Sequence, residues 1–267
     1  MTEPETAPSA PAWCEHGPGG HDGAAPSAAT APAGARAWLL IEFDGPWAAE
    51  ATATALPASL AKLALSADVL GIRVQLIRRP GGTGRDGGAL PDGGRDAGPA
   101  VYACWTSGPE PWQRRVNPGD LDPAALAALA AGEPPGGVAG PGPLFLVCTH
   151  GRRDRCCARF GVPLARDLAG HAAEVWETTH VGGHRFAANL VILPEGLYYG
   201  PVDASAGRDA IDAYRRGEIT AGGYRGRAGQ PAEAQEAECA AVARAGRLRL
   251  GTVSAALLAI SGVMAIM

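Results

Sequence analysis

The sequence contains almost no lysine and little excess charge of either sign. Of its 267 residues, 22 are arginine and Lys62 is the only lysine, and the formal net charge is −4. Such a balance gives no general attraction to nucleic acid or to an anionic membrane. We therefore expect no nucleic-acid partner.

The chain also begins without a secretory signal. Its first residues, MTEPETAPSAPAW, have neither the basic stretch nor the apolar run of a signal peptide. We therefore expect a cytoplasmic protein. In a reducing compartment, the six cysteines are expected to be thiols or metal ligands rather than disulfides.

Two common catalytic patterns are missing as well. The glycine-rich stretch GGTGRDGG lacks the lysine and the strand–turn–helix frame of a P-loop, which excludes nucleotide binding there. No convincing pair of carboxylates of the kind used in glycoside hydrolysis can be identified. The remaining candidates for chemistry are cysteine and histidine.

Long hydrophobic runs are absent except at the C-terminus. After Arg249 the last 18 residues carry no charge, and a membrane-spanning helix usually needs about 20 apolar residues. This stretch is only weakly hydrophobic because it is rich in alanine, glycine and serine. The composition favours a packed terminal helix or a truncated element over a membrane anchor.

Composition and periodicity divide the chain into five parts. A Pro/Ala/Gly/Ser-rich start predicts a disordered tail, and EPPGGVAGPGP is the best linker in the chain. Between them, apolar periodicity alternates between strand and helix. The predicted parts are a disordered tail at 1–36, an N-terminal α/β half at 37–132, a linker at 133–143, a second α/β domain at 144–228 and a helical, truncated C-terminal segment at 229–267.

The second domain has the element order of a thioredoxin-like fold. Its predicted order is β-α-β followed by β-β-α, which places the chain in the α/β class. The smaller first half is interpreted as a degenerate version of the same plan, on element order alone. The predicted elements of the second domain are strands at 144–151, 173–180, 186–194 and 196–202, and helices at 157–170 and 204–219.

Three cysteines lie close together in CTHGRRDRCC. Cys148 ends a predicted buried strand and Cys157 opens a predicted helix. Backbone amides at a helix N-terminus favour a thiolate, and Arg152, Arg153 and Arg155 add positive charge to the loop. The loop is therefore predicted to hold anionic sulfur.

Two histidines frame a glycine pair in HVGGH, residues 180–184. Histidines at this spacing can share a helix face around a metal, but glycine is a poor helix former and the glutamate of an HExxH motif is absent. Gly182 and Gly183 instead permit a sharp turn and a close approach to a ligand. We expect His180 and His184 to point from a loop toward one metal.

In a thioredoxin-like layout these two loops lie at the same end of the sheet. Cys148, Cys157, His180 and His184 are therefore expected to converge. Two thiolates and two imidazoles can form a structural zinc site, or a [2Fe–2S] cluster with two cysteines on one iron and two histidines on the other. A third alternative is a thiol–disulfide oxidoreductase that uses the two cysteines and leaves the histidines at the surface.

The sequence resembles the sucrase/ferredoxin-like family over roughly residues 37–228, in WLLIEFDGPW, GIRVQLIRRPG, FLVCTHGRRDRCCARFGVPLA, VWETTHVGGHRFAANLVILPEGLYYGPV and YRGRAG. In the bis-histidinyl branch of this family, C-x8-C is followed by H-x-G-G-H. Here that pattern falls on Cys148, Cys157, His180 and His184. The resemblance implies a thioredoxin-like ferredoxin domain at 144–228 that carries a [2Fe–2S] cluster as its cofactor. It implies no glycoside hydrolysis.

The resemblance further implies a one-electron carrier rather than an enzyme with a reaction of its own. Its partner would be a redox protein, either a reductase or an acceptor. Neutral imidazoles replace two thiolates, so reduction should be easier than in an all-cysteine ferredoxin. We also hypothesise that a proton follows the electron at a histidine, so that the potential rises as the pH falls. A potential independent of pH would contradict this.

Residues beside the predicted ligands are expected to support the centre. His150 follows Cys148 by two residues and should orient the ligands rather than bind the metal. The three loop arginines should either offset the negative charge of the cluster and donate hydrogen bonds to its sulfurs, or simply form a solvated basic loop. Cys156 is adjacent to Cys157, but the C-x8-C spacing favours Cys157, and successive residues at a helix start point in different directions.

Overall fold

The computed structural model describes residues 30–81, 98–140 and 142–251. The predictions for residues 1–29, for most of the glycine-rich loop and for the apolar tail from residue 252 lie outside the described residues. None of the helices in the described ranges combines the length and the apolar character that a membrane-spanning helix needs. Ala31 and Ala35 are already buried, so packing begins earlier than the sequence predicts.

The first half contains a parallel βαβ unit. Strands β1 (Ala37–Glu42) and β2 (Arg73–Arg78) pair in parallel and are connected through helix α1 (Ala58–Val69), as a parallel pair requires. Helix α2 begins after the side-chain cap of Asp122 and ends at the left-handed Gly132, which are residue types that favour the start and the end of a helix. The other elements of this half are η2 (Ala51–Ala53), β3 (Val101–Trp105), β4 (Trp112–Val116), η3 (Pro118–Asp120), α2 (Pro123–Ala131) and β5 (Val138–Ala139).

The second half has the predicted β-α-β then β-β-α order. This confirms the α/β class and the thioredoxin-like arrangement. The elements are β6 (Leu144–Cys148), α3 (Arg155–Ala169), β7 (Val175–Thr178), η4 (His184–Phe186), β8 (Leu190–Leu193), β9 (Leu197–Tyr199) and α4 (Ala204–Arg215). Strands β6 and β7 are parallel, whereas β8 pairs antiparallel with both β6 and β9.

Further elements follow α4. They are β10 (Glu218–Thr220), β11 (Tyr224–Arg227), α5 (Ala232–Ala245) and β12 (Arg247–Arg249). Strand β11 pairs antiparallel with β9 and extends the sheet, while β10 and β12 form a separate two-stranded sheet. Helix α5 lies in the segment that the sequence predicts to be helical, but the three strands were not predicted.

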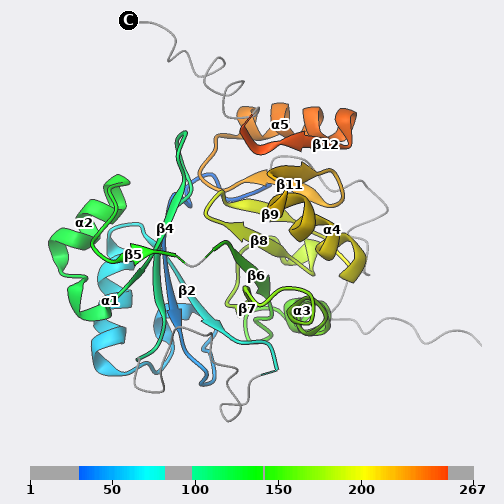
Figure 1. Cartoon of the computed structure of the whole chain (residues 1–267). Helices are drawn as coiled ribbons and strands as arrows, with labels where there is room; N and C mark the ends of the chain where they lie inside the picture. Colours follow the sequence, from blue (N-terminus) through cyan, green and yellow to red (C-terminus); the bar gives the residue numbers. More distant parts are fainter. Residues whose placement is uncertain (1–29, 82–97, 141, 252–267) are drawn as a thin grey trace, which may run out of the picture.

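One ten-stranded sheet runs through both halves (Figure 1), in the order β11-β9-β8-β6-β7-β2-β1-β3-β4-β5. The halves meet where β2 pairs antiparallel with β7, with Ile77 opposite Thr178 and Arg78 opposite Glu177. This pairing places β2 beside the loop that follows β7. The first half therefore contributes side chains to the neighbourhood of HVGGH.

Alternate residues of β6 enter two different cores. Phe145 and Val147 pack in the core with residues of α3 and α4, whereas Leu146 and Cys148 belong to the core that contains Trp38 of β1. Because both faces are buried, the strand reads as a continuous apolar run. The thiol of Cys148 is thereby placed in the interior where β6 ends.

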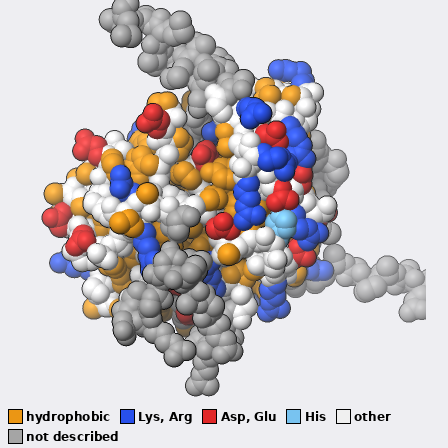
Figure 2. Space-filling view, in the orientation of Figure 1, with side chains coloured by type: hydrophobic (Ala, Val, Ile, Leu, Met, Phe, Trp, Pro, Cys, Tyr) orange, Lys and Arg blue, Asp and Glu red, His pale blue; other side chains and the backbone are white. Residues whose placement is uncertain are grey.

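The surface of the second half carries charges of both signs. On the face shown in Figure 2, acidic and basic side chains are interspersed. The ion pairs of α4 include Arg215 with Glu174 at 2.9 Å and Arg208 with Asp167. Mixed surfaces of this kind generate no strong field of one sign.

Candidate metal centre

The turn between β6 and α3 brings two cysteines together. The carboxylate of Asp154 caps the helix by accepting a hydrogen bond from the Cys156 amide at 2.8 Å. Cys157 therefore lies in the first turn, and the helix begins slightly earlier than predicted. Gly161, one turn later, faces the backbone oxygen of Cys148 so closely that any Cβ would collide with it. The missing side chain lets α3 lie against the end of β6.

Three of the four predicted ligands converge. Cys148 and Cys157 are 1% and 0% exposed, and Sγ of Cys157 lies 3.5 Å from Nδ1 of His180. The donor atoms of the three residues all lie within 4.8 Å of one another. In the part of the chain that the structure describes, this is the one group of three such donors close enough to hold a metal ion.

A hydrogen bond between the two thiols shifts their pKa values in opposite directions. The Cys157 thiol donates to the Cys148 sulfur and lowers the pKa of Cys148 well below its usual value, and His180 and the His150 amide lower it further. The same hydrogen bond, together with burial, raises the pKa of Cys157. The two thiols therefore differ in acidity, and a metal bound by both sulfurs displaces the protons of both.

The HVGGH loop makes the sharp turn that its glycines predict. Gly182 and Gly183 have φ angles of 93° and 68°, the left-handed region in which other residues are strained. The Val181 carbonyl accepts a hydrogen bond from the Tyr198 hydroxyl at 3.0 Å, which ties the loop to β9. His184 begins η4, but its side chain lies outside the described part, so its role as fourth ligand stays a prediction.

His150 holds the loop with both nitrogens of its ring. The residue is 2% exposed, Nε2 lies 2.7 Å from the Ala48 carbonyl oxygen, and Nδ1 accepts a hydrogen bond from the His180 amide at 3.1 Å. This pattern requires a neutral ring with its proton on Nε2. Burial lowers the pKa of His150, which also favours the neutral ring. The geometry therefore supports an orienting role for His150.

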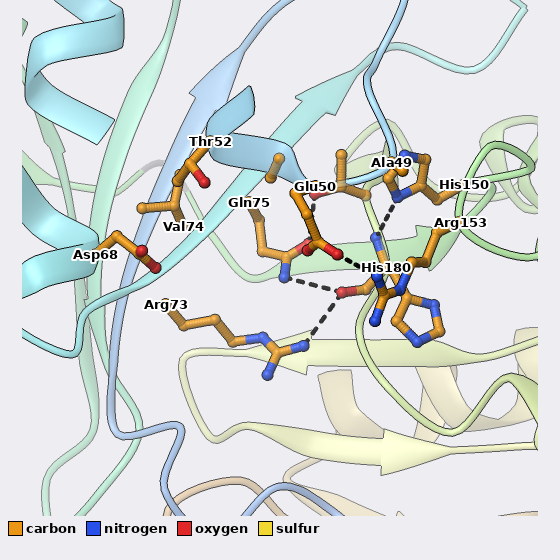
Figure 3. Close-up of a pocket in the computed structure, with 12 residues that line it drawn as sticks. Ala49, Glu50, Thr52, Asp68, Arg73, Val74, Gln75, His150, Arg153 and His180 are labelled. Atoms are coloured by element: carbon orange, nitrogen blue, oxygen red, sulfur yellow. Dashed lines mark hydrogen bonds and ion pairs between the residues drawn. The ribbon is translucent and has the colours of Figure 1, made fainter. Parts of the chain in front are cut away.

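Sequence reasoning missed two side chains of the first half that hold His180. Its carbonyl oxygen accepts hydrogen bonds from Arg73 Nη2 and Gln75 Nε2, both at 3.2 Å (Figure 3). Oε1 of Gln75 accepts from the Thr179 hydroxyl at 2.7 Å. A glutamine inside the apolar strand IRVQLIRR was the available signal, because a buried amide requires partners. The sequence did not show which partners these would be.

A half-open pocket of about 290 Å³ borders His180. Both halves line it, and Glu50 and Arg153 form an ion pair at its side (Figure 3). Asp68 and Arg73 also line the pocket, so its wall carries both signs of charge. Among the three converging residues, His180 therefore lies at the pocket, whereas the two sulfurs are buried.

The three loop arginines lie at the surface. Arg152, Arg153 and Arg155 are all exposed, and Arg153 pairs with Glu50. Solvent and salt screen exposed charges strongly. These arginines therefore influence the centre less than a buried cation would.

Cys156 packs apart from the other two cysteines of the loop. It is 7% exposed and contacts Phe160 and Ala187, whereas Cys148 and Cys157 share a different core. The structure thus places Cys157, and not Cys156, beside His180.

Comparison with known proteins identifies related chains. The family described as sucrase/ferredoxin-like matches residues 32–226. A protein named altered inheritance of mitochondria protein 32 from Meyerozyma guilliermondii is 33% identical over 96 residues, which cover 31% of this chain and 34% of that protein. Its namesake from Eremothecium gossypii is 29% identical over 99 residues, covering 31% and 32%. The match thus spans about a third of these curated relatives. No solved structure matches this chain significantly.

Proposed function

Because this chain belongs to the sucrase/ferredoxin-like family, we propose that it binds a [2Fe–2S] cluster and carries single electrons. The proposed ligands are Cys148, Cys157, His180 and His184. The observation that supports this most directly is the convergence of two buried sulfurs with Nδ1 of His180. The word ferredoxin in the description of the family agrees with this donor set.

The donor set suits soft and borderline metals. Thiolate and imidazole favour iron–sulfur clusters and zinc, whereas magnesium and calcium require oxygen ligands. A bound [2Fe–2S] cluster supplies one-electron chemistry. Cys148 and Cys157 hold it from the buried side, and His180 from the side of the polar pocket. A redox partner protein, either a reductase or an acceptor, therefore approaches at His180. Coupling of the electron to a proton stays a prediction.

The test is to measure iron, sulfide and spectra of the full chain. The proposal expects red-brown protein with about two irons and two sulfides per chain, and an EPR signal after reduction. Cys148→Ser and Cys157→Ser should lose the cluster. Cys156→Ser is the matched control and should keep it, since that thiol packs elsewhere. A cluster that survives in Cys157→Ser would contradict the assignment of ligands.

One distance favours a single metal ion. Tetrahedral zinc, with Zn–S of about 2.3 Å and Zn–N of about 2.1 Å, places its sulfur and nitrogen ligands about 3.6 Å apart. Sγ of Cys157 and Nδ1 of His180 are 3.5 Å apart. The second candidate function is therefore a zinc-stabilised binding module. Such a protein would be colourless, would contain about one zinc per chain, and would remain EPR-silent after reduction.

The hydrogen-bonded thiol pair supports a third candidate, thiol–disulfide exchange. Its activity would require Cys148 and Cys157 but would tolerate loss of both histidines. An assay of disulfide reduction on a His180→Ala/His184→Ala variant separates it from the metal-binding candidates, both of which need the imidazoles.

A further inference from the structure

Arg225 of β11 is a buried cation whose hydrogen-bond acceptors are all neutral. It is 1% exposed, and it donates to Thr30 Oγ1 at 2.8 Å, to the Thr30 carbonyl at 3.1 Å and to Asn189 Oδ1 at 2.5 Å. Among the residues that the structure describes, no carboxylate forms an ion pair with it. Burial lowers the pKa of Arg225 to about 10, so the side chain stays charged at neutral pH.

Arg227, on the same strand, provides a comparison. It is 5% exposed, and its Nε lies 2.9 Å from Oε1 of Glu238, which is 3% exposed. Although burial lowers the pKa of Arg227, Tyr224 and Glu238 together raise it above its usual value. A buried charge without a partner is costly. The partners of Arg225 are instead neutral, namely three hydrogen-bond acceptors and the ring of Phe186, whose centroid lies 4.0 Å from Cζ. A nearby anion would therefore stabilise this charge further.

The guanidinium of Arg225 lies against the HVGGH loop. A Cβ on Gly183 would be 2.5 Å from Nη2 of Arg225, so the guanidinium leaves no space for a side chain there. Asn189 connects this charge to both ligand segments. Its Oδ1 accepts from Arg225, its Nδ2 donates to the Gly183 carbonyl at 3.1 Å, and its own carbonyl accepts from the Cys148 amide at 3.1 Å.

We propose that Arg225 is the buried counter-charge of the metal centre and raises its reduction potential. The inference rests on the proposed [2Fe–2S] function. Two ferric ions, two sulfides, two thiolates and two neutral imidazoles sum to no net charge. One electron from a one-electron donor reduces one ferric ion and leaves a single negative charge. A fixed cation in a low-dielectric interior stabilises that charge more than an exposed arginine does. Arg225 is thus a positioning residue for the loop and the electrostatic partner of the reduced state.

The experiment compares Arg225→Gln with Arg225→Lys in the full chain reconstituted with iron and sulfide. The glutamine variant should have a lower reduction potential than wild type because the charge is gone, whereas the lysine variant should stay close to wild type. Arg152→Gln removes an exposed charge and is the control, with a smaller shift expected. In unfolding experiments, Arg225→Gln should lose less stability in the metal-free chain than in the loaded, reduced chain, since only the latter contains the negative charge that the electron adds.

Five results separate this proposal from its alternatives. An unchanged potential in loaded Arg225→Gln, or an equal fall in Arg225→Lys, overturns the inference and leaves the proposed function intact. If only the lysine variant can be loaded with iron, the charge is required for assembly, which supports the inference. If neither variant can be loaded, the loop depends on the geometry of the guanidinium and not on its charge, and the inference is overturned. A wild-type chain that binds no iron overturns the proposed function itself.

Discussion

Replacement of Gly161 by alanine should separate the two cysteine ligands. Gly161 follows Cys157 by one helical turn, and its open side faces the backbone oxygen of Cys148, where an added Cβ would lie far inside van der Waals contact. Because the obstacle is backbone rather than a flexible side chain, α3 and β6 would have to move apart. The sulfur of Cys157 would move away from Cys148 with the helix.

The expected loss of stability is the difference between two opposing effects. Overpacking usually costs about 1–3 kcal/mol, and a collision with backbone belongs at the upper end of that range. Alanine in a helix interior is favoured over glycine by about 1 kcal/mol. We therefore expect the free energy of unfolding of the metal-free chain to fall by about 2 kcal/mol, a factor of about 30 in the folding equilibrium.

Gly207→Ala in α4 is the matched control for this prediction. The nearest atoms to a Cβ at Gly207 are the methyl carbons of Leu168, at 3.1 and 3.2 Å, and a small side-chain rotation relieves that contact. The free energy of unfolding of Gly207→Ala should therefore stay close to that of wild type. Urea unfolding followed by circular dichroism measures both variants, and metal analysis reports the site. Full stability and full metal content in Gly161→Ala would refute the reasoning that close contact of α3 with β6 holds the ligands together.

Further residues of the second half are open to similar tests. His150→Ala leaves a backbone carbonyl and the His180 amide without partners, so the metal-free chain should lose about 1–3 kcal/mol in urea unfolding, and undiminished metal affinity would argue against an orienting role. Arg227→Met should lower stability by about 3–5 kcal/mol because Glu238 is left buried and unpaired; a double variant with Glu238→Met should recover most of that loss in thermal unfolding. His184→Cys should keep a cluster but lower its reduction potential because a thiolate adds negative charge, and a potential equal to wild type would count against His184 as a ligand.

Local periodicity predicted the α-helices and most of the strands of both halves. The helices expected at 157–170 and 204–219 correspond to α3 and α4, because both bury a regular apolar pattern. Two of the strands that were missed, WQRRV in β4 and YRGR in β11, are rich in arginine. Their extended form depends on pairing with a neighbour across the sheet. Such pairing leaves no local pattern in the sequence.

The sequence by itself determined the chemistry of the proposed ligands. The spacing between Cys148 and Cys157 confines both thiols to one strand–helix turn, and the glycines of HVGGH bend the backbone wherever that segment lies. Only the tertiary structure decided what surrounds these loops. Gln75 reaches the His180 carbonyl across 105 residues of chain because β2 pairs with β7, and Arg225 meets Gly183 because β11 extends the sheet beside β9. Ligand type and loop shape are local properties, whereas hydrogen bonds and charges that position and balance the site arise from contacts between distant segments.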